Sequence, residues 1–142
     1  MRVRTALTGI SGVILAASLT SPGHAAPTQC PPELLIFQRV VDPPAGTRAF
    51  DRAPKHPWDN AAFSDGPPEE QAWLAPDSTK RDGKTIINRW QFTKSTDGVW
   101  LSCDYQGTSL SVALPLPKTM TACEVTYDNT VSPPRATSLT CR

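Results

Sequence analysis

The chain has 142 residues, with 14 basic and 13 acidic side chains and a formal net charge of +1. It shows no basic patch, charged tail or polybasic cluster, which excludes the usual electrostatic signatures of nucleic-acid binding and of attachment to an anionic membrane. The length suits one domain with one modest core. Fifteen prolines argue against long helices and favour short strands joined by rigid turns.

The first 25 residues have the three parts of a cleavable export signal. Arg2 and Arg4 form a basic start, residues 6–19 are an apolar run, and small residues precede a cleavage point after Ala25. The apolar run is shorter than the ~20 residues that a membrane-spanning helix needs. The sequence therefore predicts a signal peptide of residues 1–25 and a single domain of residues 26–142, located in the periplasm without a stable membrane anchor.

Four cysteines, Cys30, Cys103, Cys123 and Cys141, follow the predicted cleavage point. An even number of cysteines in an oxidising compartment predicts two disulfides. Zinc is the alternative, but the sequence has no C-x-x-C pair, and His56 is the single histidine after the cleavage point. We therefore expect structural disulfides, no metal site and no cofactor.

Apolar and polar residues alternate with period two in five segments of the C-terminal half, which predicts strands. The segments are residues 86–92, 99–105, 110–114, 123–127 and 137–141. Asp97 and Gly98 lie between the first two, and this turn sequence predicts that they form a hairpin.

A sixth strand is expected upstream, in the apolar run of residues 34–41, and a central position is favoured because both of its faces are apolar. Residues 42–83 are rich in proline and aromatic residues and are expected to pack on the sheet as a cover. At most one short helix is expected there, within residues 69–74. The predicted fold is mainly β: an antiparallel meander, a small sandwich or an open barrel of about six strands.

The disulfide pairing can be argued from strand register. If the last two strands are antiparallel neighbours, pairing Cys123 with Cys141 also pairs Val125 with Leu139 and Tyr127 with Thr137. In a meander Cys103 is then too far from Cys123, which favours Cys30 with Cys103. Curling of the sheet leaves a bond between Cys103 and Cys123 as the alternative.

Two groups of residues are candidates for catalysis. His56 is a possible general base, but a lone histidine in a proline-rich loop is usually a surface residue, and no G-x-S-x-G motif accompanies it. Glu69 and Glu70 could act as a carboxylate pair, although adjacent glutamates are more typical of a solvated helix start. We therefore assign no catalytic residue.

The tryptophans are better candidates for recognition, since rigid aromatic side chains on loops make strong contacts at small entropic cost. Trp58 and Trp73 lie in the proline-rich segment, and Trp100 lies on the strand face opposite Cys103. Trp90 has the phase of a core residue. Possible binding residues are therefore Trp58, Trp73 and Trp100, although for Trp100 burial under the covering segment is favoured over exposure to a partner.

Several motifs resemble one family of small exported proteins of Gram-negative bacteria, known by an enterobacterial locus-tag name. They are Cys30-Pro31 near the mature start, W-L-x-C-x-Y at residues 100–105, C-x-V-x-Y at residues 123–127 and the terminal Cys141. The resemblance implies a periplasmic location and supports the cysteine framework. It implies no catalytic residue.

Two function classes remain. The first is a periplasmic binding protein without catalysis, such as an inhibitor or immunity protein directed at a cell-wall hydrolase or toxin, whose partner is a periplasmic or envelope protein. The second is a small envelope hydrolase that uses carboxylates near Glu69 and Glu70. The absence of a catalytic constellation and the aromatic loops favour the first.

Overall fold

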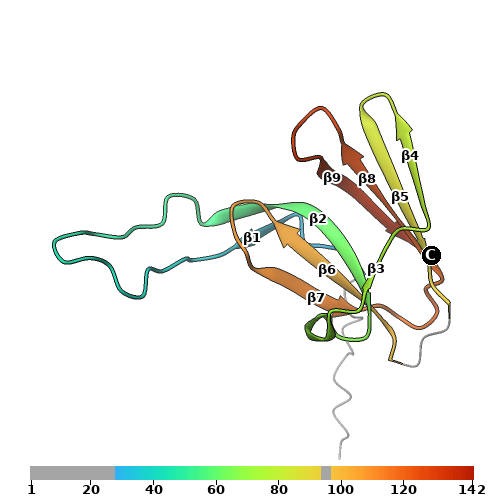
Figure 1. The fold of residues 1–142 in the computed structure, drawn as a ribbon, viewed down its shortest axis with the longest axis horizontal. Helices are drawn as coiled ribbons and strands as arrows, with labels where there is room; N and C mark the ends of the chain where they lie inside the picture. The colour runs from blue at the N-terminus through green and yellow to red at the C-terminus, as the bar shows by residue number, and fades with distance from the viewer. Residues whose placement is uncertain (1–27, 94–96) are drawn as a thin grey trace, which may run out of the picture.

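The computed structural model describes residues 28–93 and 97–142, so the predicted signal peptide lies outside the described residues. Within these ranges the fold is mainly β, as expected, with nine strands and a single 3-10 turn, Pro68–Glu70. No helix in the described ranges is long and apolar enough to span a bilayer. The strands form two curled antiparallel sheets, which agrees with the expected small sandwich rather than with the single meander (Figure 1).

The first sheet has the order β1-β2-β6-β7, with β3 also paired to β2. Its strands are β1 (Glu33–Leu35), β2 (Lys55–Asp65), β3 (Trp73–Leu74), β6 (Val99–Tyr105) and β7 (Ser111–Pro115). The second sheet has the order β4-β5-β8-β9. Its strands are β4 (Ser78–Asp82), β5 (Thr85–Gln91), β8 (Ala122–Asp128) and β9 (Arg135–Cys141). Strand β9 also lies against β2, which brings the two sheets together.

The predicted hairpin of residues 86–92 and 99–105 is wrong. Strand β5 pairs with β4 and β8, whereas β6 pairs with β2 and β7, so the two segments belong to different sheets. Gly98 does have the positive φ of a turn residue, +83°, but its carbonyl accepts a hydrogen bond from the Gly66 N–H group of the first sheet. The turn therefore carries the chain from one sheet to the other.

The expectations for residues 34–83 are also corrected. The run 34–41 contributes only part of a three-residue edge strand, β1, and not a central strand. Residues 55–65 form β2, which pairs on both sides and is the central strand of the first sheet. The remaining proline-rich residues, 36–54, extend away from the sheet instead of covering it (Figure 1). The expected helix within 69–74 is reduced to the 3-10 turn.

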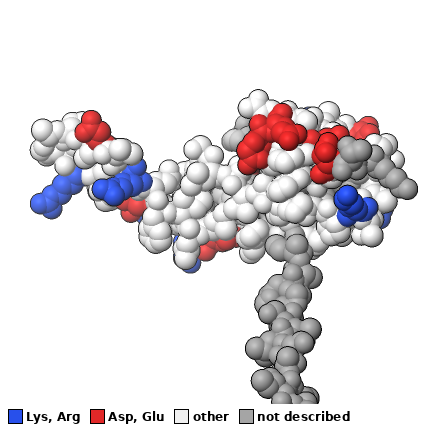
Figure 2. Space-filling view, turned by 90° about the horizontal axis from the view of Figure 1, so that it is seen from below, with Lys and Arg blue, Asp and Glu red and all other residues white. Residues whose placement is uncertain are grey.

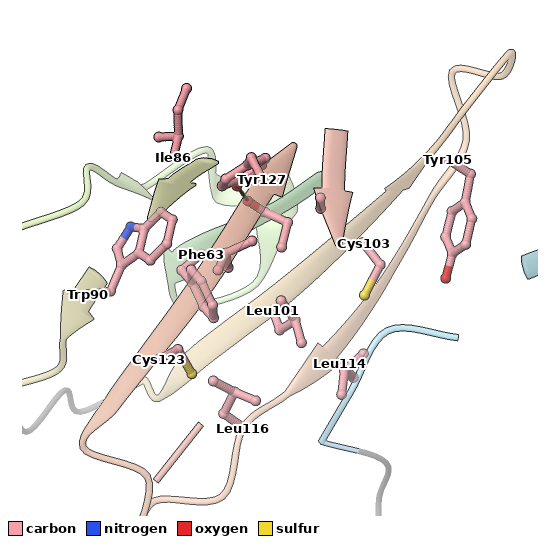
Figure 3. Packing of buried hydrophobic residues seen from close by; sticks show 13 residues of the cluster. Phe63, Ile86, Trp90, Leu101, Cys103, Tyr105, Leu114, Leu116, Cys123 and Tyr127 are labelled. Atoms are coloured by element: carbon pink, nitrogen blue, oxygen red, sulfur yellow. Dashed lines mark hydrogen bonds between the residues drawn. The ribbon is translucent and has the colours of Figure 1, made fainter. Parts of the chain in front are cut away.

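The core lies where the two sheets face each other (Figure 3). Phe63 of β2 is fully buried, and its ring centroid is 4.8 Å from that of Trp90 on β5 and 5.3 Å from that of Phe92. Leu101 of β6 and Val125 of β8 are also fully buried. The apolar residues that alternate along each strand thus face the core as predicted, but the core lies between two sheets.

The β8–β9 register agrees with the sequence prediction at one end only. Cys123 pairs with Cys141 and Val125 with Leu139, but Tyr127 pairs with Ala136 rather than with Thr137. A β-bulge causes the shift, because it places one extra residue in β9. That residue, Thr137, turns outward and donates a hydrogen bond from its hydroxyl group to the Thr126 carbonyl.

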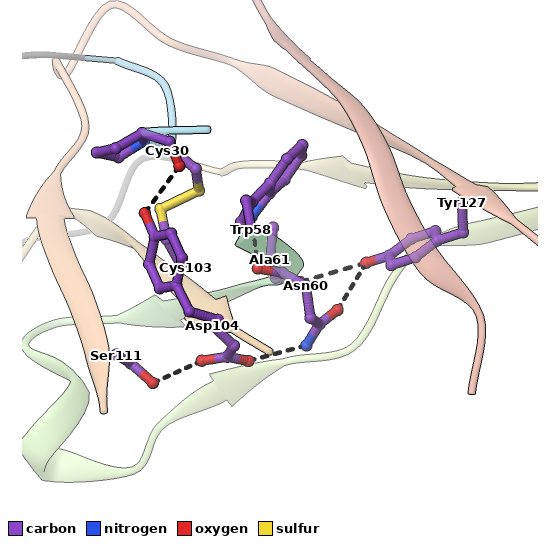
Figure 4. Close-up of a disulfide and its surroundings, with 10 residues drawn as sticks. Cys30, Trp58, Asn60, Ala61, Cys103, Asp104, Ser111 and Tyr127 are labelled. Atoms are coloured by element: carbon purple, nitrogen blue, oxygen red, sulfur yellow. Dashed lines mark hydrogen bonds between the residues drawn. A yellow bond between two sulfur atoms is a disulfide. The ribbon is translucent and has the colours of Figure 1, made fainter. Parts of the chain in front are cut away.

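Both disulfides join the pairs that the register argument favoured. The Cys123–Cys141 bond links directly paired residues of β8 and β9, and the Cys30–Cys103 bond links the residues before β1 to the middle of β6. Near the Cys30–Cys103 bond (Figure 4), the Tyr105 hydroxyl donates to the Pro31 carbonyl at 3.0 Å. The backbone N–H of Trp58 donates to the Pro32 carbonyl at 2.9 Å. The start of β1 is therefore held covalently and by hydrogen bonds.

A polar network joins the two sheets (Figure 4). Asp104 of β6 accepts hydrogen bonds from the Asn60 amide at 2.9 Å and from the Ser111 hydroxyl at 2.6 Å. The Tyr127 hydroxyl of β8 donates to the Asn60 side-chain oxygen at 3.1 Å. Burial raises the pKa of Tyr127 to about 12, and the negative charge of Asp104 acts in the same direction.

Removing each disulfide by paired cysteine-to-alanine substitution should destabilise the fold to a degree set by the length of chain that it closes. The sequence separations of 73 and 18 residues predict losses of about 4 kcal/mol for Cys30–Cys103 and about 3 kcal/mol for Cys123–Cys141. Urea unfolding of the oxidised proteins measures both. A larger loss for the shorter loop would contradict this account.

The substitution Tyr127→Phe should cost about 1 kcal/mol at pH 7, because it removes the hydroxyl that bridges the sheets. The raised pKa of Tyr127 means that its contribution is complete below pH 10 and is lost as the pH rises towards about 12. The stability difference between the unmodified protein and the variant should therefore shrink over that interval. Chemical unfolding at stepped pH values tests this, and a difference that stays constant up to pH 12 would refute it.

Candidate functional site

The expectation that His56 is a surface residue is wrong. His56 is the second residue of β2, is 4% exposed, and donates a hydrogen bond from Nδ1 to the Gln106 carbonyl at 2.7 Å. Its Nε2 atom is buried and has no hydrogen-bond partner among the described residues. A ring held in this way fixes the turn between β6 and β7 to β2 and is not presented to a substrate.

Glu69 and Glu70 lie on the 3-10 turn that links β2 to β3, and both are exposed. Their carboxylates follow each other on an open surface and do not face each other across a cleft. Within residues 28–93 and 97–142, no group of three or more histidine, cysteine, aspartate or glutamate residues could hold a metal ion.

Two of the three candidate tryptophans share one face of the first sheet. Ser64 of β2 pairs with Trp73 of β3 on one side and with Trp100 of β6 on the other, and Trp100 pairs in turn with Pro115 of β7. Directly paired residues project to the same face. These four residues, the tryptophan row, therefore run across the sheet. Trp73 is 51% exposed, Trp100 is half-buried and Ser64 is fully buried.

Trp58 lies apart from the tryptophan row, near the opposite end of β2. It is half-buried, pairs with Tyr105 and donates a hydrogen bond from its indole N–H to the Asn60 carbonyl at 2.7 Å. Its polar group is thus satisfied internally. The structure brings Trp73 and Trp100 together and leaves Trp58 as part of the β2–β6 packing.

The most exposed apolar surface is one that the sequence analysis did not single out. Residues 36–54, here called the arm, leave the sheet after β1 and return to it at β2 (Figure 1). The arm carries four of the nine large hydrophobic side chains that are exposed in the described part of the chain. They are Phe37, Val40, Val41 and Phe50, exposed by 78%, 52%, 93% and 73%.

The base of the arm is closed by specific hydrogen bonds. The Ile36 N–H donates to the Pro54 carbonyl, and the Asp51 carboxylate accepts from the N–H groups of Gln38 at 2.9 Å and Ala53 at 3.1 Å. The Gln38 side chain also donates to the Gly107 carbonyl of the β6–β7 turn at 3.1 Å. The backbone hydrogen bond from Gln38, followed by that from Ala53, holds the pKa of the Asp51 carboxyl below its usual value of 3.8.

A signal for the arm is present in the sequence. The apolar run of residues 34–41 ends at Asp42-Pro43-Pro44, and the return segment contains Arg48 and Arg52 but no second apolar strand that could pair with it. An apolar run without a partner strand and next to consecutive prolines is poorly suited to the centre of a sheet. The apolar composition of residues 34–41 favoured burial, whereas the prolines that follow the run favour a projecting segment.

Comparison with known proteins gives one family and one relative. The family described as type VI secretion system Tli immunity protein matches residues 52–142, which include every strand except β1. An uncharacterised 16.3 kDa protein encoded 5′ of trpG in Azospirillum brasilense is 28% identical over 122 residues, which is 81% of each chain. No solved structure matches the chain significantly.

The family match covers more than half of the chain and includes the tryptophan row, the core and three of the four cysteines. It agrees with the expectation of an inhibitor or immunity protein whose partner is another protein. The chain belongs to the type VI secretion system Tli immunity protein family and is an immunity protein that acts on a toxin or hydrolase.

Proposed function

We propose that this chain is exported to the periplasm and neutralises a type VI secretion toxin there by forming a stable one-to-one complex with it. The observation that carries the proposal is the family match over residues 52–142. Two disulfides support the compartment, since such bonds persist in oxidising environments and are rare in the cytosol. The export signal expected in residues 1–25 supplies the route.

Neutralisation by binding, without catalysis, agrees with the positions of the candidate catalytic side chains. His56 is hydrogen-bonded inside the fold, and Glu69 and Glu70 are exposed on a turn. The second candidate, a carboxylate hydrolase at Glu69 and Glu70, has no supporting geometry in the described residues. Occlusion of the toxin by a rigid surface requires only complementary shape and chemistry.

The tryptophan row is the contact surface that we propose within the part of the chain shared with the family. Trp73 projects from the sheet with half of its side chain exposed, and Trp100 lies on the same face with Ser64 between the two. Large aromatic side chains held on a sheet lose little conformational freedom on binding, which makes them typical hot-spot residues. Trp58 is assigned a supporting role in the sheet.

The periplasmic location is tested in cells challenged with an attacker strain that delivers the cognate type VI effector. The full chain should protect the cells, and the mature protein recovered from the periplasm should begin at Ala26. A version that lacks residues 2–25 should not protect, because it stays in a reducing compartment where its disulfides do not persist. Equal protection by that version would refute the proposed location.

The contact role of the tryptophan row is tested by Trp73→Ala, with Val131→Ala as the control in an exposed loop of the second sheet. Trp73→Ala should weaken binding of the purified cognate effector by about 30-fold, as expected for an aromatic hot spot, whereas Val131→Ala should bind as the unmodified chain does. Calorimetric titration measures both, and thermal unfolding checks the fold. Equal affinities would exclude the row as a contact surface.

A further inference from the structure

We propose that the arm, residues 36–54, is the element that selects the cognate toxin, and that it inserts into an apolar cleft with an acidic rim on that toxin. The inference rests on the proposed function and goes beyond it, because it assigns partner choice to a segment that lies mostly outside the family match. Only residues 52–54 of the arm fall within the matched residues 52–142.

The exposed apolar side chains of the arm argue for a protein partner. Val41 is 93% exposed and Phe37 is 78% exposed, although the core of the same protein buries Phe63 and Leu101 completely. Exposed apolar surface concentrated on one segment marks an interaction site more reliably than scattered single residues do. Side chains on a thin projecting segment contact a concave surface most effectively.

The charged residues of the arm indicate that the rim of the cleft on the toxin is acidic. The arm carries Arg39, Arg48 and Arg52 against Asp42 and Asp51, and the Asp51 carboxylate is occupied by two backbone N–H groups at the base. The Arg52 guanidinium lies over the Phe50 ring, 5.4 Å from its centroid. Figure 2 shows both basic and acidic side chains on the arm at the left, and acidic side chains gathered on the body. Because arginines outnumber aspartates on the arm, its charge favours an acidic partner.

The base of the arm is ordered, which lowers the cost of binding. The hydrogen bonds to Asp51, the Ile36–Pro54 backbone bond and the Gln38–Gly107 bond hold the two ends together. A segment held in its bound direction loses less conformational freedom on association than a free loop does. Because the base is fixed, the choice of the cognate toxin depends on the side chains at the exposed end of the arm.

The central experiment compares the unmodified mature chain with two arm variants in binding to the purified cognate effector. Val41→Ser with Phe50→Ser should lower the affinity by about 30-fold or more, mainly through faster dissociation. Arg39→Glu with Arg48→Glu should slow association and abolish most of its dependence on salt concentration. Surface plasmon resonance at low and physiological salt measures both rate constants.

Matched controls lie on the second sheet. Val131→Ser makes the same chemical change as Val41→Ser at an exposed position between β8 and β9, and Arg81→Glu makes the same charge change as Arg48→Glu on the exposed edge strand β4. Both controls should bind within about twofold of the unmodified chain, which corresponds to a negligible contact energy. Binding of the arm variants within the same twofold range would overturn the proposal.

A second variant, Asp51→Ala, tests the ordering of the arm without removing any side chain proposed to touch the toxin. It should speed hydrogen exchange at the Gln38 and Ala53 N–H groups and slow association with the effector several-fold. The same loss of order is expected in the unmodified chain at low pH. The pKa of Asp51 is lowered, and the hydrogen bonds that its carboxylate accepts are lost as the pH falls through that pKa. Unchanged exchange in Asp51→Ala would count against the ordered base.

The remaining outcomes separate this inference from the proposed function. If the unmodified chain neutralises the effector and the arm variants do so equally well, the arm proposal fails while the proposed function stands. If the unmodified chain neither binds the effector nor protects cells, the proposed function fails. Self-association of the chain that the arm variants abolish, or arm-dependent binding to phosphatidylglycerol vesicles in place of the effector, would also overturn the choice of partner.

Discussion

The Cys30–Cys103 bond is the constraint on which the direction of the arm depends. Strand β1 has three residues and lies at the edge of its sheet, so its own ladder is a weak attachment. The disulfide fixes the chain three residues before β1 to the centre of β6, where Cys103 is fully buried. The hydrogen bonds to Pro31 and Pro32 extend this attachment. The arm therefore starts from a fixed point of the core.

The two sheets are coupled by burial and by hydrogen bonds that meet on β2. Phe63 packs between the sheets against Trp90, and the Trp90 indole N–H donates to the Leu74 carbonyl of β3. Asn60 connects the same strand to β8 through Tyr127. Because β2 also carries the returning end of the arm and pairs with β3, the two proposed contact surfaces are attached to one rigid strand.

The sequence predicts strands well here and their partners less well. Alternation located β6 and β8 almost to the residue and set the Cys123–Cys141 register, because these signals are local. The hairpin of residues 86–92 and 99–105 failed because a turn signal specifies a reversal and not which strands pair afterwards. The prediction for the run 34–41 failed because apolar composition predicts burial, whereas Phe37, Val40 and Val41 are exposed in the structure. Among the candidate binding residues, the pairing of Trp73 with Trp100 through Ser64 required the register of β2, which no local pattern reveals.

An immunity protein must keep its contact surface exposed until the toxin arrives, and exposed apolar segments promote aggregation. The arm contains two features that oppose it. Pro43 and Pro44 follow the apolar run after Asp42 and remove backbone donors that a neighbouring strand would use. The arginines separate the apolar side chains and repel a second arm of the same charge. The same prolines and arginines that keep the segment out of the sheet thus keep it available for a partner of opposite charge.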